Sequence, residues 1–161
     1  CMVADVTLAR RFRELGIVPV LQPDIHRLGD GYIAALGMER ASQVIPMQLF
    51  DTMNIQVAFS SDCPVIPCNP LHVIRSAMER QTPAGIVLGP EHRVSALQAL
   101  QRYTVGGACA TRTEAHKGRL RTGMFADFTV LSADPAMTSP EDFQQIRVTR
   151  TVTGGEVRYQ A

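Results

Sequence analysis

The stretch "IQVAFSSDCPV" (Ile55–Val65) decides the fold of this chain. Its first five residues, Ile55–Phe59, are mostly apolar and predict a buried strand. Two serines follow, then Asp62, and Pro64 ends the pairing because proline has no backbone N–H to donate. The stretch therefore places a carboxylate at the carboxyl end of a strand, with no Lys or Arg near it in sequence.

Helices and strands alternate on the N-terminal side of this stretch. The segment "DVTLARRFRELG" (5–16) predicts a helix capped by Asp5, and the strand Ile17–Leu21 follows it directly. The segment "PMQLFDTMN" (46–54) predicts a helix that leads into the strand Ile55–Phe59. Helix, strand, helix and strand joined by short connections are typical of parallel β/α units, so the expected fold class is α/β.

The C-terminal part of the chain changes in character. Two more helices are predicted first, "NPLHVIRSAMER" (69–80) and "SALQALQRYT" (95–104). Short β-rich segments then follow, with a hairpin expected around Gly154-Gly155; they are Thr129–Leu131, Val148–Val152 and Val157–Tyr159. We therefore expect two domains, β/α units in residues 1–113 and a β-rich segment in residues 114–161.

Composition and charge exclude several classes of partner. The chain is 45% hydrophobic and 19% charged, which is ordinary for a globular protein. Its net charge is +1, and its basic residues are scattered, so we expect neither nucleic acid nor a membrane as partner. No apolar run approaches the ~20 residues that span a bilayer.

The N-terminus and the cysteines bear on the origin of the chain. The sequence begins at Cys1 without an initiator Met or a signal-peptide pattern, so we expect a cytoplasmic protein and a fragment or processed product. The cysteines lack zinc-site spacing; reduced thiols are favoured over a bridge between Cys63 and Cys68.

Asp62 can be satisfied in more than one way. In open α/β sheets and (β/α)8 barrels the chemistry takes place at the carboxyl ends of the strands, which is where Asp62 lies. Backbone N–H groups of the following turn, solvent or a metal ion could each stabilise its charge. Spacing alone favours a turn cap. In that case the chain would be a non-catalytic α/β module for binding or assembly.

Several motifs occur together in a fixed order and resemble one family. They are "LQPDIHRLGD" (21–30), "SDCPV" (61–65), "ALQRYT" (99–104) and "GRLRTGMFAD" (118–127). In this order they resemble the C-terminal part of the amidohydrolase superfamily, especially the branch that includes N-substituted formamide deformylases. The resemblance covers nearly the whole chain.

The resemblance implies a fold and a reaction. The chain would be the C-terminal part of a (β/α)8 TIM-like barrel, followed by strands of a composite β-sandwich. The parent enzyme would hydrolyse non-peptide C–N bonds of a small amide-type substrate. It would use a divalent metal, with zinc favoured, as one or two ions. In the family, the aspartate that ends the last barrel strand touches the metal site. It takes a proton from the metal-bound water and passes it to the leaving nitrogen, which is the role implied for Asp62.

The rest of the site is expected from other parts of the parent enzyme and from the preceding strand. The family's other metal ligands lie upstream: a His-x-His, a carboxylated Lys or a Glu, and two further histidines. We therefore expect the isolated chain to be inactive and its open strand edges to allow association between copies. Gln22 and His26, near the end of the preceding strand, are candidates for substrate binding. His72, His92 and His116 are expected on the surface.

Overall fold

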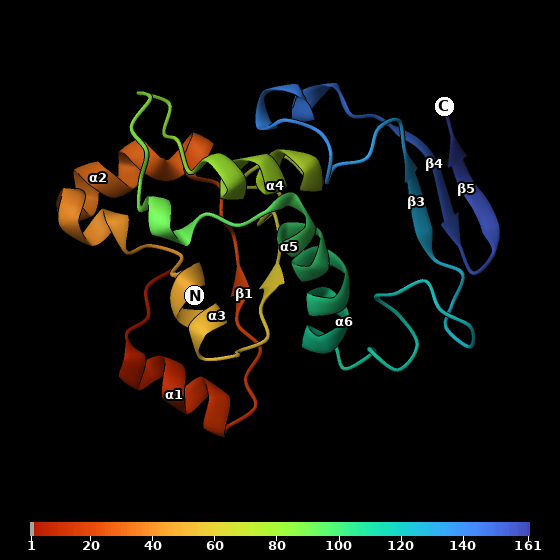
Figure 1. Ribbon diagram of the computed structural model, residues 1–161, viewed down its shortest axis with the longest axis horizontal. Helices are drawn as coiled ribbons and strands as arrows, with labels where there is room; N and C mark the ends of the chain where they lie inside the picture. The colour runs from red at the N-terminus through yellow and green to blue at the C-terminus, as the bar shows by residue number, and fades with distance from the viewer. Residues whose placement is uncertain (1) are drawn as a thin grey trace.

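The computed structural model describes residues 2–161 as a mixed α/β structure (Figure 1). The helices are α1 (Val6–Glu14), α2 (Ile25–Ser42), α3 (Met47–Thr52), α4 (Pro70–Glu79), α5 (Ala96–Gln101) and α6 (Gly107–Ala110), with the shorter helical turns η1 (Pro90–His92), η2 (Arg102–Gly106) and η3 (Pro140–Gln145). The strands are β1 (Val20–Leu21), β2 (Ala58–Phe59), β3 (Phe128–Leu131), β4 (Val148–Thr153) and β5 (Glu156–Gln160).

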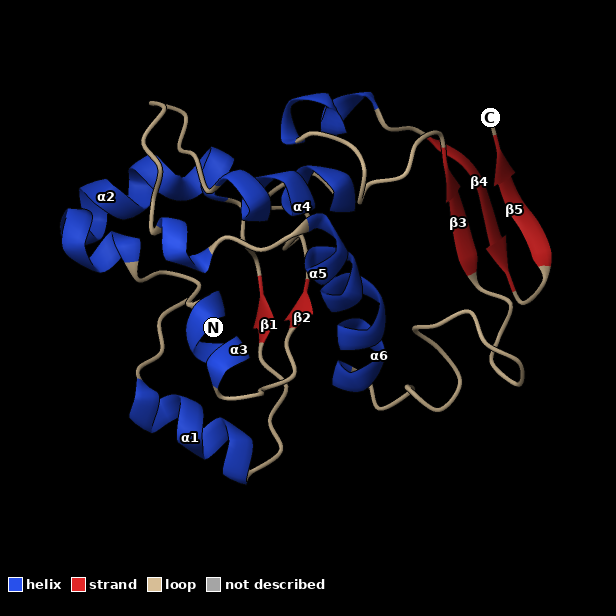
Figure 2. Ribbon diagram, viewed as in Figure 1, coloured by secondary structure: helices blue, strands red, loops and turns tan. Residues whose placement is uncertain are grey.

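Strands β1 and β2 form a parallel pair at the centre of the helical part (Figure 2). Val20 pairs with Ala58, and Leu21 pairs with Phe59. Both strands are shorter than the predicted Ile17–Leu21 and Ile55–Phe59. One reason is that each strand has only one described neighbour. The other is that Pro19 has no N–H to donate and contributes only its carbonyl, which accepts from the N–H of Ala58 at 3.0 Å. The parallel order confirms the predicted β/α units, and both carboxyl ends lie at the same edge.

The predicted helices with caps are confirmed. The Leu8 N–H donates to Asp5 Oδ1 at 2.7 Å at the start of α1, and Asn69 caps α4 by accepting from the N–H groups of Leu71 and His72. Ser95 begins α5 with a capping box that is completed by Gln98. These caps depend on contacts within four residues, so the sequence alone can indicate them.

Helix α2 was not predicted. The stretch Ile25–Ser42 contains Gly29, Gly31 and Gly37, and its apolar residues do not gather on one face. Gly37 interrupts the helix with φ 74°, a left-handed conformation that suits glycine. The helix forms because its ends pack into the core, where Ile25 and Ala41 are fully buried.

Helices α5 and α6 join through the π-helical turn η2, and η2 and α6 pack against β2. A Cβ added to Gly106 would lie 2.2 Å from the carbonyl oxygen of Val57, so only glycine allows this close approach. Gly107 is also helical, but a Cβ added there would meet nothing within 4 Å. The close packing therefore requires glycine at position 106, whereas position 107 has room for a side chain.

This difference predicts opposite effects of the same substitution. Gly106→Ala should destabilise the fold by about 1–3 kcal/mol, because the new methyl group displaces the backbone before β2. Gly107→Ala should stabilise it by about 0.4–1 kcal/mol, because alanine restricts the unfolded chain without a clash. Urea unfolding of the two variants measures both values. Equal effects would show that the close approach at Gly106 does not exist.

The predicted β-rich C-terminal segment is an antiparallel sheet in the order β3-β4-β5, at the far end of the molecule from α1 and α2 (Figure 2). The hairpin turns at Gly154 and Gly155, which have φ 60° and 81° as a tight two-residue turn requires. Between β3 and β4 the chain returns to α4, where Phe143 and Ile146 join the same hydrophobic core as the β/α part. The segment is thus anchored to the first part of the chain.

A buried arginine connects three segments of the helical part. Arg80 is 1% exposed and ends α4 in a left-handed conformation, with φ 49°. Its Nε donates to Leu88 O at 2.6 Å, its Nη2 to Val44 O at 2.9 Å and its Nη1 to Ile45 O at 3.4 Å. Burial lowers the pKa of Arg80 to about 10, so the guanidinium stays charged at neutral pH.

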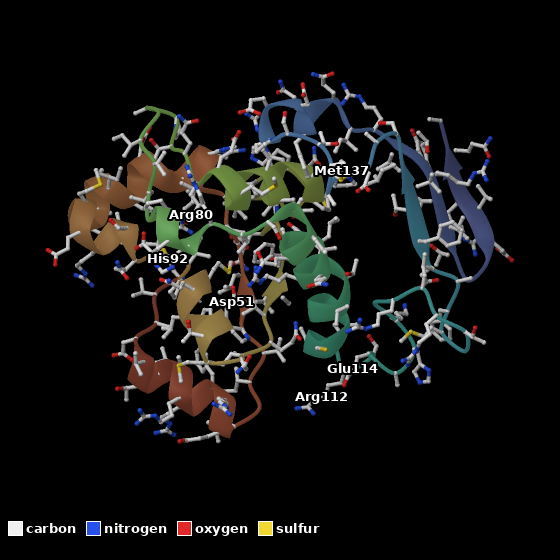
Figure 3. All side chains as sticks on the ribbon, viewed as in Figure 1. Asp51, Arg80, His92, Arg112, Glu114 and Met137 are labelled. Carbon is white, nitrogen blue, oxygen red and sulfur yellow. The ribbon has the colours of Figure 1, made fainter. Side chains whose placement is uncertain are left out.

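His92 lies near Arg80, between α2 and α3 (Figure 3). The expected surface position of His92 is wrong: it is 5% exposed, and its Nδ1 accepts the N–H of Gln48 at 3.4 Å. Burial, followed by the charge of Arg80, lowers the pKa of His92. The expectation failed because the polar neighbours of His92 in sequence do not reveal the core contact. His116 is exposed, as predicted.

Candidate functional site

The structure brings Asp62 and Gln22 to one cavity at the carboxyl ends of β1 and β2. The cavity has a volume of about 190 Å³. Its polar lining comes from Gln22, Tyr32 and Asp62. The remaining lining is apolar and consists of Met2, Leu28, Ile45, Val65 and Ile66. A mostly apolar cavity with a few convergent polar groups is the usual form of a small-molecule site.

Asp62 is exposed and has a left-handed backbone, with φ 57°. Aspartate is one of the few residues other than glycine that adopt this conformation readily, and such positions gather at functional sites. Within residues 2–161 no N–H or O–H group donates to its carboxylate; only its backbone carbonyl is engaged, by the Val65 N–H at 2.8 Å. The side chain therefore caps no turn in the described chain, and the turn-cap interpretation is wrong.

Gln22 links the two strand ends. Its Nε2 donates to Ser60 Oγ at 3.1 Å, and the Ser60 N–H donates to the carbonyl of Leu21 at 2.9 Å. These bonds hold the amide of Gln22 at the edge of the cavity. An amide held in this way can present its carbonyl oxygen to a polar ligand.

His26 is held away from this cavity. Its Nε2 lies 2.7 Å from Glu79 Oε2, and its backbone N–H donates to Ser76 Oγ at 3.0 Å. Burial lowers the pKa of His26, and the carboxylate of Glu79 opposes this effect. The imidazole thus joins α2 to α4 and does not line the cavity that contains Asp62.

Asp24 and His72 form a pair that the sequence did not indicate. Asp24 is fully buried at the start of α2, and its Oδ1 lies 3.1 Å from His72 Nε2. The side chain of His72 is 37% exposed, so its expected surface position holds only in part. The hydrogen bond to Asp24 raises the pKa of His72 against the effect of burial. The rings of His26 and His72 also meet edge to face, with centroids 5.9 Å apart.

This pair predicts a pH dependence of stability. Because the pKa of His72 is raised above its value of 6.5 in the unfolded chain, its bond to Asp24 stabilises fully below pH 6.5. That stabilisation is lost as the pH rises through the native pKa. We expect the free energy of unfolding of the wild type to exceed that of His72→Gln most in mild acid, with the difference shrinking as the pH rises above 6.5 and through the native pKa of His72.

Urea unfolding across this pH range measures the difference between the two proteins. The lowered pKa of His92 acts in the opposite direction, but it is present in both proteins and therefore cancels in the comparison. The charge of His72 also lowers the pKa of His26, so the same comparison is made in a His26→Gln background, where this coupling is absent. A difference that stays constant with pH would contradict the pairing of His72 with Asp24.

The part of the chain that the structure describes does not form a complete metal centre. No group of three or more His, Cys, Asp or Glu side chains in it could hold an ion. A catalytic zinc site needs about three protein ligands. The described chain offers the carboxylate of Asp62 as one oxygen ligand, and no N–H or O–H group of the described chain donates to it.

Among the helices of residues 2–161, none combines the length and apolar character needed to cross a membrane.

Comparisons with known proteins place this geometry in context. Residues 1–159 match a family model described as "Amidohydrolase family". The chain is 28% identical over 163 residues to the N-substituted formamide deformylase of Arthrobacter pascens, and the match covers 98% of this chain and 30% of that protein. It is 38% identical over 160 residues to the protein LONG AFTER FAR-RED 3 of Arabidopsis thaliana, and this match covers 94% of this chain and 26% of that protein.

A solved structure has the same fold. It is that of an uncharacterized metal-dependent hydrolase from Pyrococcus furiosus, with a TM-score of 0.69 and 27% identity over 84% of this chain and 27% of that chain. The present chain therefore spans roughly a quarter to a third of the length of the proteins it matches.

Proposed function

Since this chain belongs to the amidohydrolase family, we propose that it is the C-terminal part of a longer metal-dependent enzyme that hydrolyses non-peptide C–N bonds in small amide-type molecules. Asp62 carries the proposal. Its carboxylate follows a parallel strand, lines a cavity with Gln22, and accepts no hydrogen bond from the described chain. A carboxylate left free at this position suits a ligand or a reacting group supplied from elsewhere.

The proposed reaction assigns distinct tasks to the side chains of the cavity. A bound divalent metal would supply a water molecule whose pKa is lowered to about 7. Asp62 would contribute one oxygen ligand, and its carboxylate would accept the proton that the attacking water loses and return it to the departing nitrogen. The carbonyl oxygen of Gln22 accepts a hydrogen bond from the amide N–H of the substrate. A contact between His26 and substrate would require its imidazole to leave Glu79.

The same proposal extends to the architecture. Strands β1 and β2 would be the last two strands of a (β/α)8 barrel, with residues 1–113 as its C-terminal β/α units. Residues 114–161 would add β3–β5 to a β-sandwich. The parallel pairing of β1 with β2 and the separate antiparallel sheet support this division. Zinc, as one or two ions, is the metal proposed.

Metal removal tests the proposal. The full-length gene product that contains this chain should bind a divalent metal and hydrolyse small amide-type molecules. Chelation should abolish hydrolysis, and added zinc should restore it, because the attacking water needs a lowered pKa. The 161-residue chain alone should show no hydrolysis, since no group of three or more possible ligand side chains in residues 2–161 could hold the ion. A full-length protein that contains no metal yet hydrolyses amides would overturn the proposal.

A further inference from the structure

Tyr32 is the polar group of the cavity that has no assigned task. It lies on α2 and lines the cavity together with Gln22 and Asp62. No hydrogen bond joins its hydroxyl group to another residue in the described chain, whereas Nε2 of Gln22 is occupied by Ser60. The ring itself packs against the hydrophobic core. Tyr32 therefore combines a ring packed against the core with an uncommitted hydroxyl group, on a residue that lines the same cavity as Asp62.

The chemical state of this hydroxyl is well defined. Burial raises the pKa of Tyr32, and the negative charges of Asp24 and Asp62 raise it further. The phenol therefore remains protonated at neutral pH and can donate one hydrogen bond. Asp62 and the carbonyl oxygen of Gln22 can only accept, so Tyr32 supplies a donor where the other two groups supply acceptors.

The charge of the cavity limits which classes of ligand can bind in it. Asp62 is its one charged lining residue, and no Lys, Arg or His is among the described residues that line it. Once the proposed metal is removed, a carboxylate or phosphate group here would meet the like charge of Asp62, and no cationic side chain among the described lining residues could balance it. The apolar residues Leu28, Ile45 and Ile66 instead favour a hydrocarbon substituent.

We propose that Tyr32 is a substrate-binding residue whose hydroxyl donates to the carbonyl oxygen of an uncharged amide with an apolar substituent. This inference rests on the proposed function, because it takes the amide of that reaction as the ligand. It adds a donor for the carbonyl oxygen, and it disfavours an anionic group on the apolar substituent, because no cationic side chain among the described lining residues could pair with it. Gln22 and Tyr32 together then match both polar atoms of a secondary amide.

Two related probes test the proposal without turnover. Acetanilide is an uncharged amide with an apolar ring, and 4-acetamidobenzoate differs from it by one carboxylate. Calorimetry in the full-length gene product, after chelation of its metal, measures the dissociation constant of each. We expect the wild type to bind acetanilide at least about 5-fold more tightly than 4-acetamidobenzoate. Tyr32→Phe should weaken acetanilide binding by about 2- to 10-fold, since it removes one hydrogen bond.

Controls separate this role from a structural one. Tyr159→Phe changes a half-exposed tyrosine on β5 and should leave both dissociation constants at their wild-type values. Asp62→Asn should narrow the difference between the two probes, because the like charge is removed. Equal binding of the probes by the wild type, wild-type affinity in Tyr32→Phe, or no binding of acetanilide would overturn the proposal. Metal content and hydrolysis play no part in these titrations, so they can fail independently of the proposed reaction.

Discussion

Asp62→Asn in the full-length gene product is expected to lower kcat/KM for amide hydrolysis by at least about 100-fold, because the loss of a proton-transfer group costs 10²–10⁴-fold. Asparagine cannot hold the proton that the attacking water loses, and its neutral amide is a weaker metal ligand. The bound metal should therefore also decrease. Steady-state kinetics and metal analysis of the purified variant measure the two effects separately.

The substitution is well matched to its position. Asparagine has nearly the same shape as aspartate and tolerates the left-handed φ of 57° found at Asp62. Folding should be preserved, which thermal unfolding checks. Asp5→Asn is the control: Asp5 caps α1 away from the cavity, and asparagine caps equally well, so kinetics and metal content should not change. Wild-type hydrolysis in Asp62→Asn would remove Asp62 from the mechanism.

Arg80→Met is expected to lower the free energy of unfolding by about 2–6 kcal/mol, because two buried carbonyl groups lose their donors and each unsatisfied group costs about 1–3 kcal/mol. The guanidinium of Arg80 donates to the carbonyl groups of Val44, Ile45 and Leu88, which lie on two other segments. The carbonyl of Ile45 also accepts from the N–H of Met47 at 2.9 Å, so methionine leaves the carbonyls of Val44 and Leu88 buried without these donors. Methionine fills much of the same volume, so the loss reports the missing donors rather than a cavity. Urea unfolding of the chain measures it.

Two further variants establish the cause. Arg80→Lys keeps the charge but replaces the planar group by a point charge that cannot reach all three carbonyls, so its loss should be intermediate. Arg150→Met removes an exposed arginine on β4 and should change stability by less than about 0.5 kcal/mol. If Arg80→Met were as stable as Arg150→Met, the hydrogen bonds of Arg80 would contribute nothing to the fold.

The elements predicted from the sequence share a physical property. The caps at Asp5, Asn69 and Ser95, and the glycine turn of the β4–β5 hairpin, are made by residues within a few positions of one another. A local pattern is enough to specify such features. The strand before Asp62 was found for a similar reason, although its paired part is shorter than its apolar run. The amidohydrolase family followed from several such local motifs in a fixed order.

The parts that were missed depend on contacts between distant residues. Helix α2 has no amphipathic pattern and is held by its packing. His72 meets Asp24 across 48 positions, and Arg80 meets Val44 across 36. In sequence, Arg80 resembles an ordinary charged residue at the end of a surface helix. Nothing near Arg80 or His72 in the chain indicates a buried partner.

The sequence by itself thus determined the type of most helices and strands and the position of Asp62 at the end of one of them, because short-range caps and hydrophobic patterns carry that information. Only the tertiary structure decided what surrounds Asp62. It brought Gln22 and Tyr32 to one cavity with Asp62, and it turned His26 towards Glu79. The reason is that a side chain meets its partners only when distant elements pack together, and the free energy of that packing depends on all of the packed segments.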